Sequence, residues 1–413
     1  MKRRLFVSLV LFVIAVSQKS YGSDPLTMES AVSHALSNNV ELAAVRFTIA
    51  EAQARVGQAG RWSNPELETE FAPNLNGRER SWRVGFDQRF PLTSRLRIEK
   101  QITRTQVKLA LSELQDFERR LSHDVRLTFL NLAALEAQIR LKIQQGDTLN
   151  ELAGASEQAA QAGEGSSLDV ALIGLELVQL DSQRLKLESE RRELTRNLTL
   201  LLGVPPEAEL LVVDNLELSD SIPSSPINLE KRPDYISALV RKDVAAQSIK
   251  LAHASRWEDA SIGLFGGVDR TKDEPIGIES DRMVGIRFSI PLPLWKNNKG
   301  RIAESNAAAQ RIEKELEATS IRITSEVKSA HEQMRAALNL AQSLKSELLP
   351  KAIALEQRLT ALSKEGQASF TDVARARERR LQFESAELDA RRDFHLAQAQ
   401  YWNASGISTL SKP

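Results

Sequence analysis

The sequence contains no cysteine, and this absence removes several kinds of site at once. Disulfide bonds, thiolate metal ligands, cysteine nucleophiles and a lipid-anchored N-terminal cysteine are all excluded. Aromatic residues make up only 5% of the 413 residues, which favours long helices over an all-β protein. Basic and acidic residues both number 55, so the chain lacks the positive excess that holds nucleic acid, and we expect no nucleic-acid partner.

Motifs for catalysis or for metal and nucleotide binding are also missing. The sequence has no glycine-rich loop ending in Lys-Ser or Lys-Thr, which is the motif that binds phosphate, and no serine nucleophile motif. Apart from Met1 there are only three methionines, too few for a soft-metal ladder. The histidines have no partner at ligand spacing; they are His34, His123, His253, His331 and His395. We therefore expect no enzyme activity, no cofactor and no metal site, and a passive role in any transport.

Residues 1–22 have the pattern of a secretory signal peptide. Three basic residues precede the apolar run Leu5 to Val16, and small residues at Ser20 and Gly22 fit the cleavage rule. The run is too short to span a bilayer, and no later run approaches about 18 apolar residues. The sequence thus predicts an exported chain without membrane helices, with an uncleaved signal anchor as the alternative.

The remaining chain contains an internal duplication. Gly163 and Gly366 each stand six residues before an Asp-Val pair, 203 positions apart. GFDQRFPL at 85–92 and GIRFSIPL at 285–292 align at an offset of 200. Several such pairs in the same order indicate two repeats. We place repeat 1 at 23–210, a proline- and serine-rich connector at 211–228, and repeat 2 at 229–413.

Both repeats predict the same elements. In the first long segment, a 3,4 spacing runs from Val107 through Leu114 and Leu121 to Ile139, which is coiled-coil periodicity. A helix of about 68 residues is roughly 100 Å long, too long for a compact domain to bury. The architecture is therefore a long helical barrel or bundle. The expected elements are an amphipathic helix (34–62 and 233–258), two strands (66–72 with 82–90, and 260–268 with 283–290), a long helix (94–162 and 295–364) and a last helix (167–202 and 370–404).

The short segments alternate with period two. Trp82, Val84 and Phe86 share one parity, and charged residues share the other, which predicts strands with one apolar and one charged face. This suits tilted membrane strands, although a soluble sheet with one buried face has the same pattern. Four strands cannot close a membrane barrel, so several chains would have to combine theirs. The candidate barrel-lumen residues are Glu66, Glu68, Glu70, Arg83, Asp87, Arg89 and Arg287.

Taken together, the ordered segments resemble the TolC-type outer-membrane efflux proteins. The resemblance rests on LTMESAVSHALSNNVEL (26–42), NPELE (64–68), RPDYISA (232–238) and the paired Gly-x5-Asp-Val turns. It implies a mainly α protein with a small β part: a long antiparallel coiled-coil α-barrel, continued by four strands per chain in a trimeric transmembrane β-barrel. It also implies a homotrimer in the outer membrane of a Gram-negative bacterium, in contact with outer-membrane lipid and with a large periplasmic part. IPLPLWKNNKGRIAES (290–305) is most similar to members that serve cobalt-zinc-cadmium resistance-nodulation-division pumps.

The same resemblance assigns the two Gly-x5-Asp-Val turns to periplasmic tips that contact an adaptor protein. These tip residues are Gly163, Asp169 and Val170, and Gly366, Asp372 and Val373. Asp372 and Arg375 are candidate pore-constriction residues, although the family's acidic ring is interrupted here by Arg375 and the arginines that follow it. The aspartates equally fit a role as helix-start carboxylates.

The hypothesis is an exit duct of a tripartite efflux system, docked through a periplasmic adaptor (membrane fusion) protein to an inner-membrane resistance-nodulation-division pump, and carrying heavy-metal cations. Two alternatives remain at this point. The same type of duct could serve drug efflux or type I protein secretion, or the chain could be a periplasmic coiled-coil scaffold without a pore.

Overall fold

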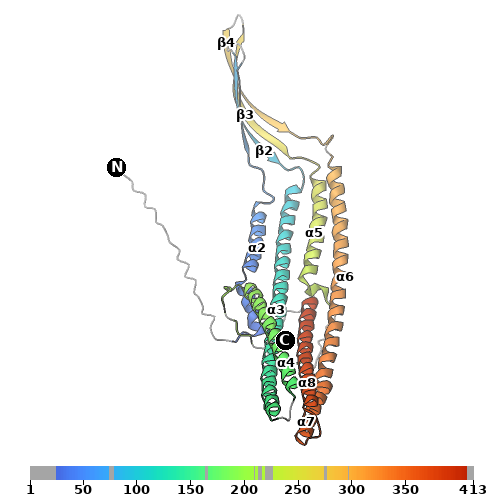
Figure 1. Cartoon of the computed structure of the whole chain (residues 1–413). Coiled ribbons are helices and arrows are strands. Elements are labelled where there is room, and N and C mark those ends of the chain that lie inside the picture. Colours follow the sequence, from blue (N-terminus) through green and yellow to red (C-terminus); the bar gives the residue numbers. More distant parts are fainter. Residues whose placement is uncertain are drawn as a thin grey trace, which may run out of the picture.

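The computed structural model describes residues 25–73, 79–162, 166–208, 210–212, 216–218, 227–273, 277–295 and 297–406. The expected signal peptide lies outside these residues. Long helices run side by side, and a small sheet extends from one end of them (Figure 1). The order of elements is α1 (Met28–Asn38), α2 (Val40–Gln58), β1 (Glu66–Pro73), β2 (Arg80–Phe90), α3 (Arg95–Gln161), α4 (Ser167–Leu202), η1 (Leu229–Lys231), α5 (Pro233–Ala254), β3 (Ala260–Asp273), β4 (Gly277–Ser289), α6 (Lys299–Ser343), η2 (Leu344–Leu348), α7 (Leu349–Lys364) and α8 (Phe370–Ser405).

The apolar seam of α3 forms the core of the first repeat. Leu121, Val125 and Leu132, which the 3,4 spacing identified, are buried together with Phe129. α1, α2 and α4 all contact α3, so three shorter helices share the length of one long helix. In the second repeat α5 and α8 contact α6 in the same manner, and α3 contacts α8 across the repeats. A mainly helical fold with an internal repeat and a small sheet is thereby confirmed. Among the described residues, no helix is both long and apolar enough to cross a membrane.

The single helix expected over 34–62 is wrong, because Asn39 divides it into α1 and α2. The backbone of Asn39 is extended, and its side-chain oxygen accepts a hydrogen bond from the Leu42 amide at 2.9 Å, which starts a new helix. α1 begins earlier than expected, at a capping box between Thr27 and Ser30. α2 ends at Gln58, before Gly60 turns the chain with a φ of 72°. An asparagine cap inside an apolar pattern leaves the periodicity unchanged, so periodicity cannot reveal it.

The long helix expected over 295–364 is also corrected. It starts at Lys299 and is interrupted by the π-helical turn η2. Pro350 lies in the first turn of α7 and has no N–H to donate to the Ser346 carbonyl, so an α-helical hydrogen bond is missing there. The π turn directly before it accommodates that loss by widening the helix.

The four strands form one antiparallel sheet in the order β1-β2-β3-β4. β3 and β4 are longer than expected: β3 extends to Asp273 and β4 begins at Gly277. Polar pairs such as Thr271 with Glu279 continue the backbone ladder beyond the alternating apolar residues. Hydrophobic alternation therefore marks only the part of each strand with an apolar face.

Each repeat closes on its own beginning. Asn39, between α1 and α2, donates a hydrogen bond to the Leu201 carbonyl at the end of α4 (3.0 Å). Arg232, before α5, donates to the Ala404 carbonyl at the end of α8 (2.7 Å). Leu201 and Ala404 are 203 residues apart, the offset of the duplication. Both last helices end in a glycine with positive φ, Gly203 and Gly406, which permits the left-handed turn.

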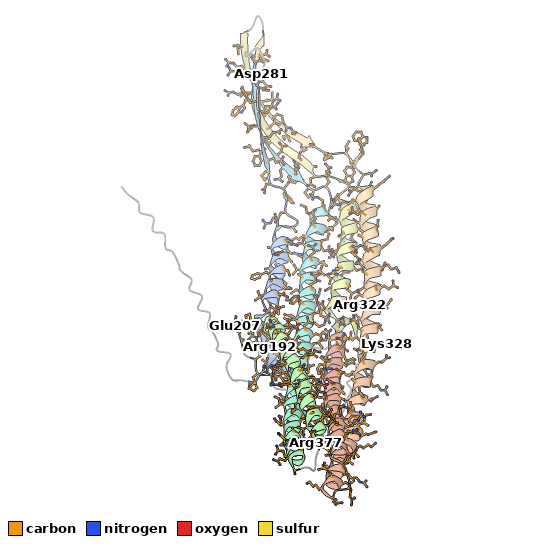
Figure 2. The ribbon with its side chains drawn as sticks, in the orientation of Figure 1. Arg192, Glu207, Asp281, Arg322, Lys328 and Arg377 are labelled. Atoms are coloured by element: carbon orange, nitrogen blue, oxygen red, sulfur yellow. The ribbon has the colours of Figure 1, made fainter. Side chains whose placement is uncertain are left out.

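Arg232 is also the centre of a buried ion-pair network. Only 2% of its side chain is exposed, and its guanidinium contacts the Asp234 carboxylate at 2.8 Å and the Glu326 carboxylate at 3.1 Å. Arg322 on α6, labelled in Figure 2, contacts the same two carboxylates from the exposed side. The network links the start of α5 to α6 and to the end of α8.

Candidate functional site

The sheet has two chemically different faces. Trp82, Phe86, Leu264 and Ile286 lie on one face, because the register pairs Phe86 with Leu264 and Leu264 with Ile286. These side chains are exposed, and Val284 on the same face reaches 82% exposure. A broad apolar face that no other described part of the chain covers needs another apolar environment. The seven candidate lumen residues all lie on the opposite face.

The charged side chains of that opposite face pair with one another. Arg89 contacts Glu66 at 2.9 Å, and Arg83 contacts Glu70 at 3.5 Å. Arg287 on β4 forms an ion pair with Glu68 on β1, which lies across two intervening strands. Arg287 also approaches the Asp87 carboxylate at 3.7 Å. The structure therefore places all seven predicted residues in ion pairs on one face, in three separate groups centred on Arg83, Arg89 and Arg287.

Sequence reasoning missed two members of this face on β3. Asp269 accepts an ion pair from Arg83 at 3.4 Å, and the ring of Phe265 lies 5.4 Å from the guanidinium carbon of Arg287. Gly263 and Gly267 have the same parity, so β3 shows the pattern Gly-Phe-Gly-Asp on this face. That pattern was a usable signal, but the apolar alternation of the other face masked it.

Glycines lie in the strands directly beneath these side chains. A Cβ added at Gly285 would lie 2.6 Å from the Phe265 ring, and one at Gly267 would lie 2.8 Å from the Arg83 side chain. At Gly263 an added Cβ would overlap the Asp87 carboxylate. The missing Cβ atoms let long side chains lie flat across neighbouring strands. Flat side chains line this face without filling the space in front of it.

At the other end of the molecule, the second Gly-x5-Asp-Val element forms the turn between α7 and α8. Gly366 has a φ of 72°, and the next amide, Gln367 N–H, donates to the Leu362 carbonyl at 2.9 Å, which closes the end of α7. Asp372 forms a capping box with Ser369: its amide lies 3.2 Å from the Ser369 hydroxyl. Hydrogen bonds from Ser369 lower the pKa of Asp372, so this carboxylate is ionised. Val373 is buried behind it.

The first element is described only in part. Gly163 lies outside the described residues. Asp169 and Val170 lie in the first turn of α4, where the Ser166 hydroxyl accepts a hydrogen bond from the Leu168 amide at 3.2 Å. Val170 is half-buried. Serine therefore caps the last helix in both repeats: Ser166 and Ser369 each stand three residues after the glycine of their element.

The arginines that follow Asp372 do not form one uniform surface. Arg375 is exposed near the tip. Arg377 and Arg380 instead form ion pairs with Glu356 on α7, at 2.9 Å and 2.5 Å (Arg377 is labelled in Figure 2). Two members of the run thus hold α7 against α8, and Arg375 remains available beside Asp372. No group of three potential metal ligands occurs among the described residues.

This combination of a long helical rod and a four-stranded sheet, with an apolar and a charged face, is that of outer-membrane channel proteins. The structure superposes on CusC with a TM-score of 0.74 at 19% identity, covering 92% of each chain. On VceC of Vibrio cholerae the TM-score is 0.74 at 16% identity, covering 92% of this chain and 96% of that one.

The sequence profile of the Outer membrane efflux protein family matches residues 31–204 and 227–406, one segment for each repeat. The chain belongs to this family, which confirms the TolC-type resemblance. It is also 23% identical to the cobalt-zinc-cadmium resistance protein CzcC of Cupriavidus metallidurans, over 98% of this chain and 96% of that protein.

Proposed function

We propose that three copies of this chain form an outer-membrane exit duct for heavy-metal cations. The observation that carries the duct is the two-faced sheet: an exposed apolar face, a charged face, and edge strands β1 and β4 with no further partner within the described sheet. Closed membrane barrels need about eight or more strands and have no free edges. Three four-stranded sheets joined edge to edge meet that requirement, with the charged faces turned to the lumen.

The cargo assignment is supported by the match to CzcC along the whole chain, since that protein is named for cobalt-zinc-cadmium resistance. The lumen face is consistent with cations. The ion pairs on this face join five carboxylates, the four predicted ones and Asp269, to three guanidinium groups. These paired side chains together carry a net charge of −2 per chain. An acidic wall raises the local concentration of cations.

The partners follow from the same proposal. Without a power source of its own, the duct would open toward an inner-membrane resistance-nodulation-division pump. A periplasmic adaptor would bind the helical tips, where Gly366 and Val373 shape the turn between α7 and α8. The expected signal peptide would take the chain to the periplasm, and the helices would project there from the outer membrane.

Conductance in planar lipid bilayers tests the duct. The purified protein should show discrete openings and a trimeric mass, and a salt gradient should reveal a preference for cations over anions. Absence of conductance together with a non-trimeric mass would favour the scaffold alternative. A deletion strain should lose tolerance to zinc, cobalt or cadmium. Unchanged tolerance to all three, in a strain without a second duct gene, would instead favour drug efflux or protein secretion.

The proposed constriction at Asp372 and Arg375 needs a variant that separates charge from helix capping. Asp372→Asn removes the charge but keeps a side-chain oxygen that can accept the hydrogen bond from the Ser369 amide in the capping box. If the three Asp372 carboxylates line the pore, this variant changes cation preference and leaves stability almost unaltered. If Asp372 serves only in the capping box, conductance stays the same in Asp372→Asn, while Asp372→Ala loses the hydrogen bonds from Ser369 and lowers stability by about 0.5–1.5 kcal/mol.

A further inference from the structure

The connection from β4 to α6 exposes a continuous apolar segment, residues 290–295. Ile290, Leu292 and Leu294 are all exposed, and Trp295 is 91% exposed, more than any other large apolar side chain in the described chain. Ile290 continues the parity of Ile286 and Phe288, so the segment extends the apolar face of the sheet toward the helices. An exposed tryptophan among exposed aliphatic residues marks a surface that needs a partner.

The duplication shows that this segment is an addition. In repeat 1, Pro91 stands four residues before the start of α3 at Arg95. In repeat 2, the matching Pro291 stands eight residues before the start of α6 at Lys299. The four extra residues include Leu294 and Trp295. Closing the connection does not need them, because repeat 1 makes the same connection without them.

The backbone of the segment leaves few free donors. Pro291 and Pro293 have no N–H, and the Leu294 amide donates to the Leu292 carbonyl at 2.8 Å within a tight turn. Such a backbone loses little when it moves from water into a less polar medium, where unsatisfied N–H groups are costly.

The far end of the segment is fixed in place. Asn298 adopts a positive φ of 60°, and its side-chain amide donates to the Ala252 carbonyl at the end of α5 (2.7 Å). The segment is therefore tied to the sheet at one end and to α5 at the other, with its apolar side chains directed outward.

Basic side chains lie on the helical side of this segment. Arg256, Lys299 and Arg301 are exposed, with Glu258 as an acidic neighbour in the sequence. An apolar band with tryptophan, followed by lysine and arginine, matches the order of acyl chains, interfacial region and phosphates at the surface of a bilayer. Because the segment lies where the sheet gives way to the helices, this order also has the direction expected for a sheet in the membrane and helices outside it.

We propose that residues 290–295 are a lipid-interface anchor, with Trp295 seated among phospholipid headgroups of the periplasmic leaflet and fixing the depth of the channel. The anchor rests on the proposed function, since it requires the sheet to lie in a membrane. A second copy of this chain is the competing occupant, because β4 is an edge strand.

Single-tryptophan variants in vesicles with brominated phospholipids test the anchor. The chain has five tryptophans, and replacing four with phenylalanine leaves one reporter at a time. The Trp295 reporter should lose fluorescence strongly when bromine is close to the headgroup and less when bromine is at the end of the acyl chain. The Trp82 reporter, on the apolar face of β2, controls for insertion, and the Trp402 reporter, in α8, should stay unquenched.

The outcomes separate the two proposals. If Trp82 is quenched and Trp295 is not, the sheet is inserted and the anchor is wrong. If Trp82 is not quenched either, the membrane duct itself fails. If Trp295 is unquenched and a disulfide forms between Trp295→Cys of one copy and Trp62→Cys of another, a second copy covers the segment and the anchor is wrong; a disulfide with Trp295 still quenched shows only that β4 and β1 of neighbouring copies lie side by side, as the duct requires, and leaves the anchor standing.

Discussion

Replacing Arg232 with methionine should destabilise the helical part of the molecule severely. The guanidinium is 2% exposed and donates to the Asp234 carboxylate, the Glu326 carboxylate and the Ala404 carbonyl. Methionine fills a similar volume but leaves two partly buried carboxylates and a buried carbonyl without this donor. Removing one partner from a buried ion pair costs about 3–5 kcal/mol. The free energy of unfolding, measured in detergent by chemical denaturation, should fall by that amount.

Arg322→Met provides the matched control, because Arg322 contacts the same two carboxylates but is 51% exposed. Water replaces its guanidinium at little cost, so a loss of about 0–1 kcal/mol is expected. If both variants lose stability equally, burial is not what makes Arg232 important, and the reasoning fails.

The pH dependence gives a second readout of the same network. Burial alone would raise the pKa of Asp234, but hydrogen bonds from Arg232 and Arg322 outweigh it and hold that pKa well below its usual range. This contribution to stability is present above the pKa of the unfolded chain, 3.8, and is lost as the pH falls below it. In Arg232→Met the acid-induced loss should therefore be smaller than in the original protein.

Three further predictions concern other parts of the chain. Burial, together with the charges of neighbouring arginines, lowers the pKa of His123 from 6.5 to about 4, so the free energy of unfolding should fall by about 3 kcal/mol as the pH drops from 6.5 to 4. His123→Gln should remove that fall in denaturation curves, and an equal fall in the variant would argue against this account. Gly366→Ala should lower the free energy of unfolding by about 1 kcal/mol, because only the positive φ opposes the new side chain. Gly203→Ala should lower it more, because the new Cβ would also overlap the Asn38 carbonyl; equal losses for the two variants in chemical denaturation would contradict this. Phe265→Ala should raise single-channel conductance, because the ring lies against Arg287 on the charged face that we propose lines the lumen; unchanged conductance would place the narrowest part of the pore elsewhere.

Regular periodicity explains what could be predicted from sequence. The 3,4 seam of α3 and the period-two strands place large apolar residues at fixed intervals, and such intervals survive without knowledge of tertiary contacts. The charged sheet face was predictable for the same reason, since Glu66, Glu68 and Glu70 alternate within a single strand.

Single polar residues explain what could not be predicted. Asn39 divides a helix through one side-chain cap, and Pro350 inserts a π turn, yet neither changes the apolar spacing. Arg232 was noticed only as part of a motif, because its partners Glu326 and Ala404 are far away in the sequence. At the tips, the sequence predicted the turn before α8 and the helix-start position of Asp372, but not the serines that cap the two helices. A pore-lining role depends on contacts between chains, which local sequence patterns do not encode.

The way each repeat ends has a consequence for its origin. In repeat 1 a carbonyl at the end of α4 accepts a hydrogen bond from Asn39, and in repeat 2 one at the end of α8 accepts a hydrogen bond from Arg232. In each repeat the end of the last helix is therefore bound to a residue near the start of the same repeat. A unit closed in this way could have existed as a separate, shorter gene product before the duplication joined two of them; the further hydrogen bond from Arg119 of repeat 1 to the Asn403 carbonyl of repeat 2 (3.3 Å) would then date from after the joining. Asn39 and Arg232 are different residue types that make this hydrogen bond at equivalent places, so the two halves have diverged in sequence while keeping the same contact.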